Sequence, residues 1–92
     1  MASFKMHKYH SDHYSGVVAY NIEDHDIKIL FPADKDGQTF IYTYSYIKPG
    51  KKHVEEMKRL AIKGSDLATY INKNIREKYE SRDRVDEIII ID

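Results

Sequence analysis

The strictest pattern in the sequence is the run TFIYTYSYI at positions 39–47, in which aromatic side chains occupy every second position. Successive side chains of a β-strand point to opposite faces of a sheet, so this period of two predicts a strand with one aromatic face. A single strand is not stable alone, and the rest of the chain must supply its neighbours and a cover for that face. The aromatic residues are Phe40, Tyr42, Tyr44 and Tyr46.

Two further strands are predicted ahead of this run. Segment 15–22 is rich in β-branched and aromatic residues, and segment 26–31 alternates apolar and polar positions. Only a short polar connection separates them, which predicts a hairpin. Pro32 then ends the second strand, and the Asp and Gly residues of ADKDG predict the turn into the third strand, over 38–47.

Two amphipathic helices are predicted after the strands. The segment KPG at 48–50 stops the sheet, and apolar residues recur at spacings of three and four over 51–62. Gly64 is expected to end the first helix in the left-handed conformation, and Ser65 is expected to cap the second. The buried stripe of the second helix is expected to comprise Leu67, Ile71, Ile75 and Tyr79.

The predicted architecture is an α+β fold: a three-stranded antiparallel β-meander followed by two α-helices packed on one face. Residues 1–14 are expected to form a flexible N-terminal arm, 15–80 a single domain, and 81–92 a linker and a C-terminal strand. The polar segment 80–84 is expected to be a solvated loop. The Ile run at 88–91 suits a strand buried on both faces, which either joins this sheet or pairs with a second copy.

Charge is unevenly distributed, although the formal net charge is zero. Segment 48–84 carries eleven Lys and Arg against six acids, and the segments on either side of it are acidic. A basic segment attracts phosphate locally, but a pI near 7.0 lies well below that of a dedicated nucleic-acid binder. We therefore expect any binding to nucleic acid to be weak and sensitive to the salt concentration.

The absence of Cys excludes disulfides, thiolate nucleophiles and thiolate metal sites, and it fits a reducing compartment. No run approaches the ~20 apolar residues of a membrane-spanning helix. The N-terminal segment lacks the apolar stretch of a signal peptide. A cytoplasmic location without a membrane partner is expected.

Three histidines near the N-terminus, His7, His10 and His13, recur at spacings of three. On a helix their imidazoles would share one face and could hold a metal ion. Terminal segments of small domains are usually poorly ordered, so we expect a polar arm and no metal or other cofactor. The sequence also lacks the common catalytic motifs, which predicts a protein that is not an enzyme and has no catalytic residues.

The aromatic run 39–47 has two interpretations. Its rings form the inner face of the sheet beneath the helices, or they form an exposed platform on which nucleobases stack. Two of the three residues between the rings are small and polar, which favours burial of the aromatic side at its Phe40 and Tyr42 end. Tyr44 or Tyr46 would then protrude beside the basic segment. The residues expected to face solvent are Ile41, Thr43 and Ser45.

Three motifs occur in order along the chain: YTYSY at 42–46, KGS at 63–65 and YINKNIREKY at 70–79. Together with the helix between the first two, they resemble the KTSC domain. This small module is named for its occurrence at the C-terminus of some lysyl-tRNA synthetases and is also found as a stand-alone bacterial protein. The family combines a Y-x-Y pair, a Ser-Lys-Gly-like turn, and an aromatic-x-Asn pattern followed by Ile-Arg/Lys and a closing Tyr.

The resemblance covers about residues 15–79, with two departures. About four extra residues separate Gly64 from Tyr70, and Lys-Pro at 48–49 replaces the family's Val-Pro. The resemblance implies RNA binding through the family's association with a tRNA-handling enzyme, and it implies no catalytic residues.

Two functions are therefore expected as alternatives. The first is a small binding module for RNA or single-stranded nucleic acid, in which cationic side chains meet phosphates, a Tyr stacks on a base and an Asn reads a base edge. The second is a protein-interaction or homodimerisation module that uses residues 86–92 for β-strand addition. The residues expected at the nucleic-acid site are Tyr44, Tyr46, Lys63, Asn72, Lys73 and Arg76.

Overall fold

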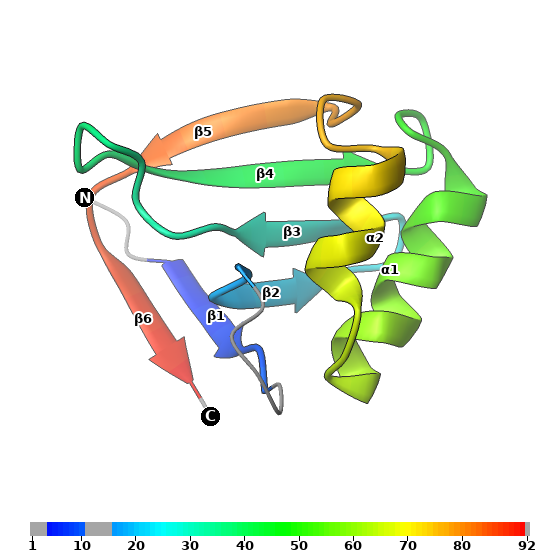
Figure 1. Cartoon of the computed structure of the whole chain (residues 1–92), viewed down its shortest axis with the longest axis horizontal. Coiled ribbons are helices and arrows are strands. Elements are labelled where there is room, and N and C mark those ends of the chain that lie inside the picture. Colours follow the sequence, from blue (N-terminus) through cyan, green and yellow to red (C-terminus); the bar gives the residue numbers. More distant parts are fainter. Residues whose placement is uncertain (1–3, 11–15, 92) are drawn as a thin grey trace.

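The computed structural model of the chain describes residues 4–10 and 16–91. These residues form an α+β fold of two helices and a six-stranded mixed sheet (Figure 1). The elements are β1 (Phe4–Lys8), β2 (Ala19–Ile22), β3 (Asp26–Leu30), β4 (Thr39–Ser45), α1 (Lys51–Lys63), α2 (Leu67–Asn74), β5 (Ser81–Val85) and β6 (Ile88–Ile91). Within the described residues, neither helix is long and apolar enough to cross a membrane.

The predicted α+β class is confirmed, but the three-stranded meander is wrong as a description of the sheet. The strand order is β5-β4-β3-β2-β1-β6, so the expected meander of β2, β3 and β4 is only its centre. Neighbouring strands run antiparallel except β1 and β6, which are parallel. The local periodicity of the three central strands is visible in the sequence, whereas the outer strands depend on pairing between distant segments.

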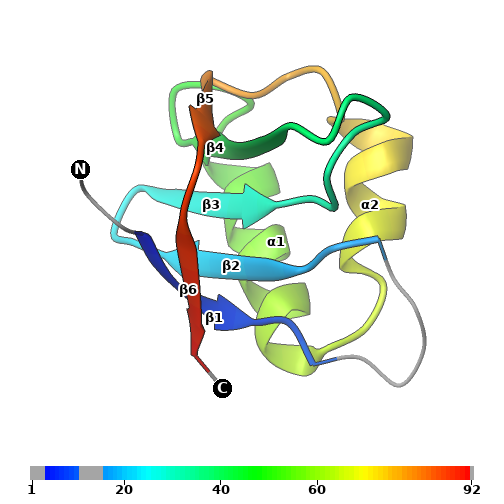
Figure 2. The same cartoon turned by 90° about the vertical axis from the view of Figure 1, so that its left-hand side faces the viewer.

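The strands β5 and β6 lie at opposite edges of the sheet, and the short connection between them requires the sheet to curl. β5 pairs with β4 and β6 pairs with β1, yet only Asp86 and Glu87 connect β5 to β6. Figure 2 shows β6 running across the face of the sheet that lies opposite α1. The end of β5 and the strand β6 therefore cover one face, and the two helices cover the other.

Two hydrophobic cores result from this arrangement. The first lies between the sheet and the helices and joins Ile29 and Tyr44 of the strands to Met57 of α1 and Ile71 of α2. The second lies on the opposite face, where β5 and β6 contribute side chains. Its buried members are Met6, Ala19, Leu30 and Ile41, with Val85 and Ile88 packed against them.

The face of β4 that was expected to be exposed is therefore buried. Ile41, Thr43 and Ser45 are 2%, 6% and 6% exposed, so the expectation that they face solvent is wrong. Ile41 belongs to the second core, and the hydroxyl of Thr43 accepts a hydrogen bond from Lys28 Nζ at 3.1 Å. The hydroxyl of Ser45 accepts the N–H groups of the following turn. The small polar side chains of Thr43 and Ser45 can be buried here because these hydrogen bonds satisfy their hydroxyl groups.

The helices cover only one half of the sheet. Figure 1 shows α1 and α2 lying over the end of β4 that leads into α1, while the opposite end, near the turn from β3, stays uncovered. This placement explains why Tyr44 of β4 is more buried than Phe40 and Tyr42. Tyr44 is fully buried, whereas Phe40 and Tyr42 are half-buried. The prediction that the Phe40 and Tyr42 end is the buried one is therefore wrong.

Three segments near the termini also differ from expectation. Residues 4–8, expected in a flexible arm, form β1 and pair with two strands. Residues 81–85, expected to lie mostly in a solvated loop, form β5, whose charged side chains face solvent as is common on edge strands. The β6 strand joins the sheet, but it is not buried on both faces, since Ile89, Ile90 and Ile91 are 44%, 42% and 39% exposed.

The junction between the helices is a tight turn. Gly64 ends α1 with a φ of 81°, and its N–H donates to the carbonyl of Leu60 at 2.9 Å, which confirms its predicted role. Ser65 is not the cap of α2, because Asp66 holds that position with a φ of 67°. Asp66 makes no capping hydrogen bond through its side chain.

The second helix is shorter than the predicted stripe. It ends at Asn74, so Ile75 caps it and Tyr79 lies in the connection to β5. Leu67, Ile71 and Ile75 are nevertheless buried as expected, and Tyr79 is half-buried against the same core.

Candidate functional site

Tyr44 was expected to protrude toward a ligand, but its ring is fully buried in the first core. Its hydroxyl donates a hydrogen bond to the carbonyl oxygen of Arg76 at 3.2 Å. Burial raises the pKa of Tyr44 well above its ordinary value. The ring is therefore closed to stacking, because this part of β4 lies beneath the helices.

Tyr46 is half-buried, and other side chains surround its ring. Its hydroxyl donates to Glu55 Oε2, and this hydrogen bond raises the pKa of Tyr46. The Nζ atoms of Lys51 and Lys58 lie 5.6 and 5.4 Å from the ring centre, and the ring of His25 meets it edge-on at 5.1 Å. A base would have to displace several of these contacts to stack on Tyr46.

Lys63 and Lys73 share a shallow hollow of about 290 Å³ between α1 and α2. Two acidic residues, Glu56 and Asp66, line the same hollow and offset much of its positive charge. Glu56 is also the ion-pair partner of Arg59. The structure thus brings these two predicted lysines together, but in a groove of mixed charge.

Asn72 lies on α2 and Arg76 in the segment after it, and neither residue lines this hollow. The two are exposed, and Arg76 Nη1 donates to Asn72 Oδ1 at 2.8 Å. Asn72 therefore orients the guanidinium of Arg76. Of the residues predicted for the nucleic-acid site, Arg76 alone lines a second hollow, at the other end of the sheet.

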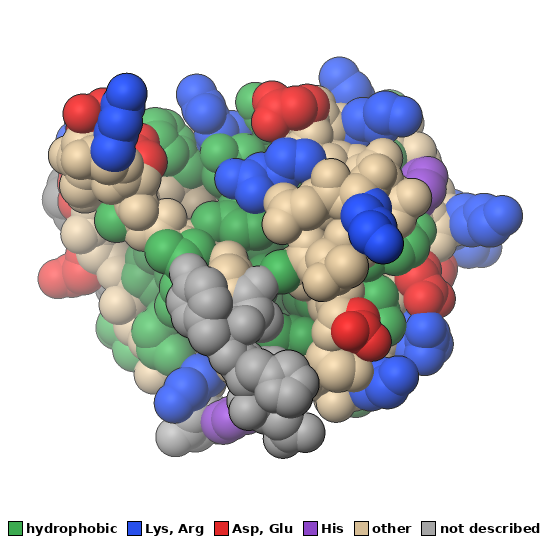
Figure 3. All heavy atoms as spheres, in the orientation of Figure 1, with side chains coloured by type: hydrophobic (Ala, Val, Ile, Leu, Met, Phe, Trp, Pro, Cys, Tyr) green, Lys and Arg blue, Asp and Glu red, His purple; other side chains and the backbone are tan. Residues whose placement is uncertain are grey.

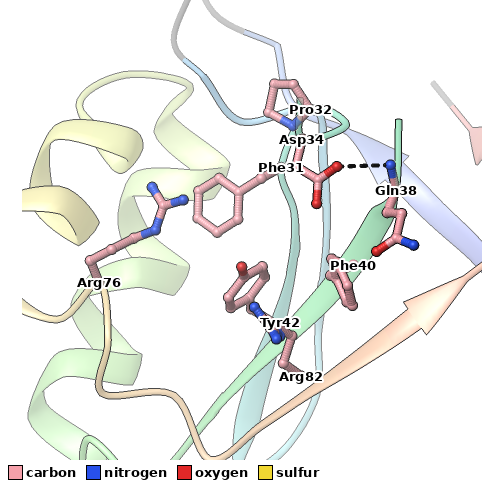
Figure 4. Close-up of a pocket in the computed structure, with 8 residues that line it drawn as sticks. All are labelled: Phe31, Pro32, Asp34, Gln38, Phe40, Tyr42, Arg76 and Arg82. Atoms are coloured by element: carbon pink, nitrogen blue, oxygen red, sulfur yellow. Dashed lines mark hydrogen bonds between the residues drawn. The ribbon is translucent and has the colours of Figure 1, made fainter. Parts of the chain in front are cut away.

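That hollow, of about 250 Å³, opens at the uncovered end of the sheet (Figure 4). Its walls come from the end of β3, the following turn, β4, the segment after α2, and β5. On this face, hydrophobic side chains lie exposed between the strands and α2, with cationic side chains beside them (Figure 3). The residues that line the hollow are Phe31, Pro32, Asp34, Gln38, Phe40, Tyr42, Arg76 and Arg82.

Two arginines stack on aromatic rings in this hollow. The Cζ atom of Arg76 lies 4.4 Å from the ring centre of Phe31, and that of Arg82 lies 4.4 Å from the ring centre of Phe40. Arg82 Cζ is also 5.9 Å from the ring centre of Tyr42. Cation–π contacts of this kind hold a guanidinium in a fixed plane while its N–H groups stay open to a ligand.

Strand register explains the placement of Arg82. The pairing of β4 with β5 sets Arg82 opposite Tyr42, so Phe40 is its diagonal neighbour on the same face. The rings of Tyr42 and Phe31 meet edge-on at 5.1 Å, which joins the aromatic surfaces under the two arginines.

Among the described residues, no direct ion pair neutralises these two arginines. Of the four arginines in the sequence, Arg59 pairs with Glu56 and Arg84 pairs with Asp86. Arg76 and Arg82 form no ion pair with any residue in the described ranges. A hydrogen bond with the Tyr42 side chain raises the pKa of Arg82 further. The hollow therefore presents two permanent cations on an aromatic surface.

The sequence contained only partial signals for this site. The alternation of 39–47 predicted that Phe40 and Tyr42 share one face. The alternating Arg residues of SRDR are consistent with the strand at 81–85, although a loop was predicted there. No local pattern could show that these two segments pair. Asp34 was predicted only as part of the turn at 33–37, and Gln38 only as the first residue of the third strand.

The histidine cluster lies only partly within the described residues. His7 lies in β1 and His10 follows that strand, whereas His13 falls outside the described residues. Within those residues no three side chains of His, Cys, Asp or Glu are placed to hold a metal ion.

Comparison of the chain with protein-family models, with curated proteins and with solved structures finds no match. The resemblance to the KTSC domain therefore rests on the motifs at 42–46, 63–65 and 70–79 alone.

Proposed function

We propose that this chain is a small, non-enzymatic module that binds single-stranded nucleic acid, with RNA as its main ligand, in the hollow between Arg76 and Arg82. One observation carries the proposal. Two arginines without a carboxylate partner among the described residues stack on aromatic rings around a single hollow of about 250 Å³.

The chemistry of the hollow fits a nucleotide. Guanidinium groups hydrogen-bond phosphate oxygens through two N–H groups at once, and they also stack on nucleobases. Exposed aromatic surface beside them supplies stacking worth about 1–3 kcal/mol per base. A volume of about 250 Å³ is slightly below the range of about 300–1,000 Å³ typical of small-molecule pockets, so it suits one nucleotide unit.

A single strand suits the hollow better than a duplex. Bases in a duplex are stacked and paired, whereas an unpaired base can leave the strand and enter a pocket. The resemblance to the KTSC domain favours RNA through that family's association with a tRNA-handling enzyme, which is an argument from association rather than from mechanism.

The test is a binding titration with matched charge variants. A fluorescent RNA octamer is titrated with the protein at ~50 mM salt, and the affinity is read from anisotropy. The Arg76→Ala/Arg82→Ala double variant is expected to lose about tenfold or more in affinity, since hydrogen bonds to charged groups contribute about 1.5–3 kcal/mol each. The control Lys52→Ala/Arg59→Ala removes the same net charge from exposed positions of α1 and is expected to bind almost as well as the wild type.

Two results would count against the proposal. One is a wild-type protein that retains no RNA at ~50 mM salt. The other is an equal loss of affinity in both double variants, because this would show that net charge, and not the hollow, determines binding.

A second candidate function is homodimerisation by strand addition at β6. The outer edge of β6 pairs with no strand of the described residues, and three of its four Ile side chains are partly exposed. An unpaired apolar edge favours the addition of another strand.

Sedimentation across a range of protein concentrations tests this second candidate. Ile89→Lys is expected to give a monomer, whereas Ile62→Lys, at a 74% exposed position on α1, is expected to keep the dimer. A wild type that stays monomeric at every concentration rules this candidate out.

A further inference from the structure

We infer that the hollow accepts an unpaired guanine base and that Asp34 selects it. This inference rests on the proposed binding of single-stranded nucleic acid and adds the identity of the base. A carboxylate, that of Asp34, lies on the wall of the hollow, and a site for phosphate alone would not be expected to have one.

The carboxylate of Asp34 is held in a fixed orientation. Its Oδ1 atom accepts hydrogen bonds from the backbone N–H groups of Asp36 and Gln38, both at 2.9 Å. Two backbone hydrogen bonds close the same turn, from Gly37 N to the Asp34 carbonyl and from Asp34 N to the Gln38 carbonyl. Figure 4 shows the side chain between Phe31 and Gln38, with its second oxygen directed toward the Phe40 and Tyr42 side.

The second oxygen of Asp34 has no hydrogen-bond donor among the described residues. An ionised carboxylate only accepts hydrogen bonds, and it repels phosphate. A base edge that presents N–H groups is the group that fits beside it. The phosphate is left to the arginines, of which Arg76 is on the wall contributed by the segment after α2.

Guanine matches this arrangement better than the other bases. Its Watson–Crick edge carries two adjacent donors, N1–H and the N2 amino group, next to the acceptor O6. Asp34 can accept from these donors, and the side-chain amide of Gln38, on the same wall, can donate to O6. Uracil has a single N–H between two carbonyl oxygens, which would face the carboxylate unfavourably.

The test uses five RNA pentanucleotides that differ only at the central base: UUGUU, UUIUU, UUAUU, UUCUU and UUUUU, in which I is inosine. A single guanine avoids quadruplex formation. Anisotropy at ~50 mM salt is expected to show UUGUU binding about tenfold or more tightly than UUUUU, since a well-formed base contact discriminates by about 1–3 kcal/mol. Inosine lacks the N2 amino group and is expected to fall between them. Binding of inosine as tight as that of guanine overturns the paired-donor argument.

Two variants assign the preference to particular side chains. Asp34→Asn keeps an oxygen acceptor for the turn but places an amide where the free carboxylate oxygen was, so it is expected to remove the guanine preference and bring the affinities for UUGUU and UUUUU to within about twofold of each other. Gln38→Leu removes the amide that donates to O6 and is expected to reduce the ratio of UUGUU to UUUUU affinity. Thermal melting confirms that both variants are folded.

The outcomes separate the inference from the proposed function. Equal binding of all five pentanucleotides to the wild type overturns the guanine inference and leaves nucleic-acid binding intact. Failure of all five to bind overturns the proposed function itself. A guanine preference that survives in folded Asp34→Asn overturns the role of Asp34.

Discussion

The hydroxyl of Tyr44 donates a hydrogen bond to the carbonyl oxygen of Arg76 at 3.2 Å, across 32 positions of sequence. This bond joins the buried end of β4 to the segment that follows α2. It thereby fixes the backbone from which the Arg76 side chain reaches Phe31. A tyrosine that resembled a ligand-binding residue thus acts as a support for an arginine at the candidate site.

Tyr44→Phe is expected to lower the free energy of unfolding by about 1 kcal/mol, because it removes a hydrogen bond and leaves the Arg76 carbonyl without that donor. Urea unfolding measures the change. Tyr46→Phe is the control, since the Tyr46 hydroxyl bonds an exposed carboxylate, and it is expected to have a smaller effect. Equal stability of Tyr44→Phe and the wild type would show that the buried bond contributes nothing.

Stability is also expected to depend on Tyr44 at high pH. Burial raises the pKa of Tyr44 above the value of 10.0 that holds for the unfolded chain. The folded protein therefore keeps a proton that the unfolded chain releases. This contribution is complete below pH 10 and is lost as the pH rises further, by about 1.4 kcal/mol per pH unit.

Urea unfolding of the wild type and of Tyr44→Phe between pH 9 and 11 measures this dependence. Other tyrosines contribute to both proteins, so the difference between the two curves isolates Tyr44. The wild type is expected to lose stability more steeply above pH 10, and parallel curves would refute the assignment.

The second core predicts a contrast between two isoleucines that lie close together in the sequence. Ile41 is 2% exposed and Ile47 is 87% exposed. Ile41→Ala is expected to cost about 2–5 kcal/mol, the range for large-to-small changes in cores, whereas Ile47→Ala is expected to stay within about 0.5 kcal/mol of the wild type. Urea unfolding of both variants checks the prediction. Similar small losses would mean that β5 and β6 do not cover this face of the sheet.

The turn between the helices predicts a contrast between two glycines. Gly37 and Gly64 have similar positive φ values of 78° and 81°, so an Ala at either position carries a backbone cost of about 1 kcal/mol. A Cβ on Gly37 would meet no atom within 4 Å, whereas one on Gly64 would overlap the carbonyl oxygen of His10. Gly64→Ala is therefore expected to lower the melting temperature clearly more than Gly37→Ala. Equal losses would contradict the packing of His10 against this turn.

Local sequence patterns predicted the three central strands, the two helices and a possible C-terminal strand, but not β1, β5 or the order of the strands in the sheet. The strands β2, β3 and β4 and the helix α1 each carry their own periodicity, and Gly64 ends α1 as expected. The pairing of β1 with β6 joins the two ends of the chain, which no local pattern specifies. The charged segment of β5 resembled a loop because an edge strand with one neighbour can leave its side chains in water.

The candidate site was only partly predictable for a related reason. Alternation showed that Phe40, Tyr42 and Tyr44 share a face, but their exposure depends on how far the helices extend over the sheet. Because α1 and α2 cover the other end of β4, the rings of Phe40 and Tyr42 remain at the hollow. Arg76 was predicted from its place on the basic segment, whereas Arg82 depends on the register of β5.

The most direct test of the account is an amide chemical-shift titration of the labelled protein with UUGUU RNA at ~50 mM salt. We predict that the largest shifts fall around the hollow, at the backbone amides of Gln38, Phe40, Tyr42, Arg76 and Arg82. Largest shifts at Lys63 and Lys73 instead, or no shifts at any amide, would contradict it.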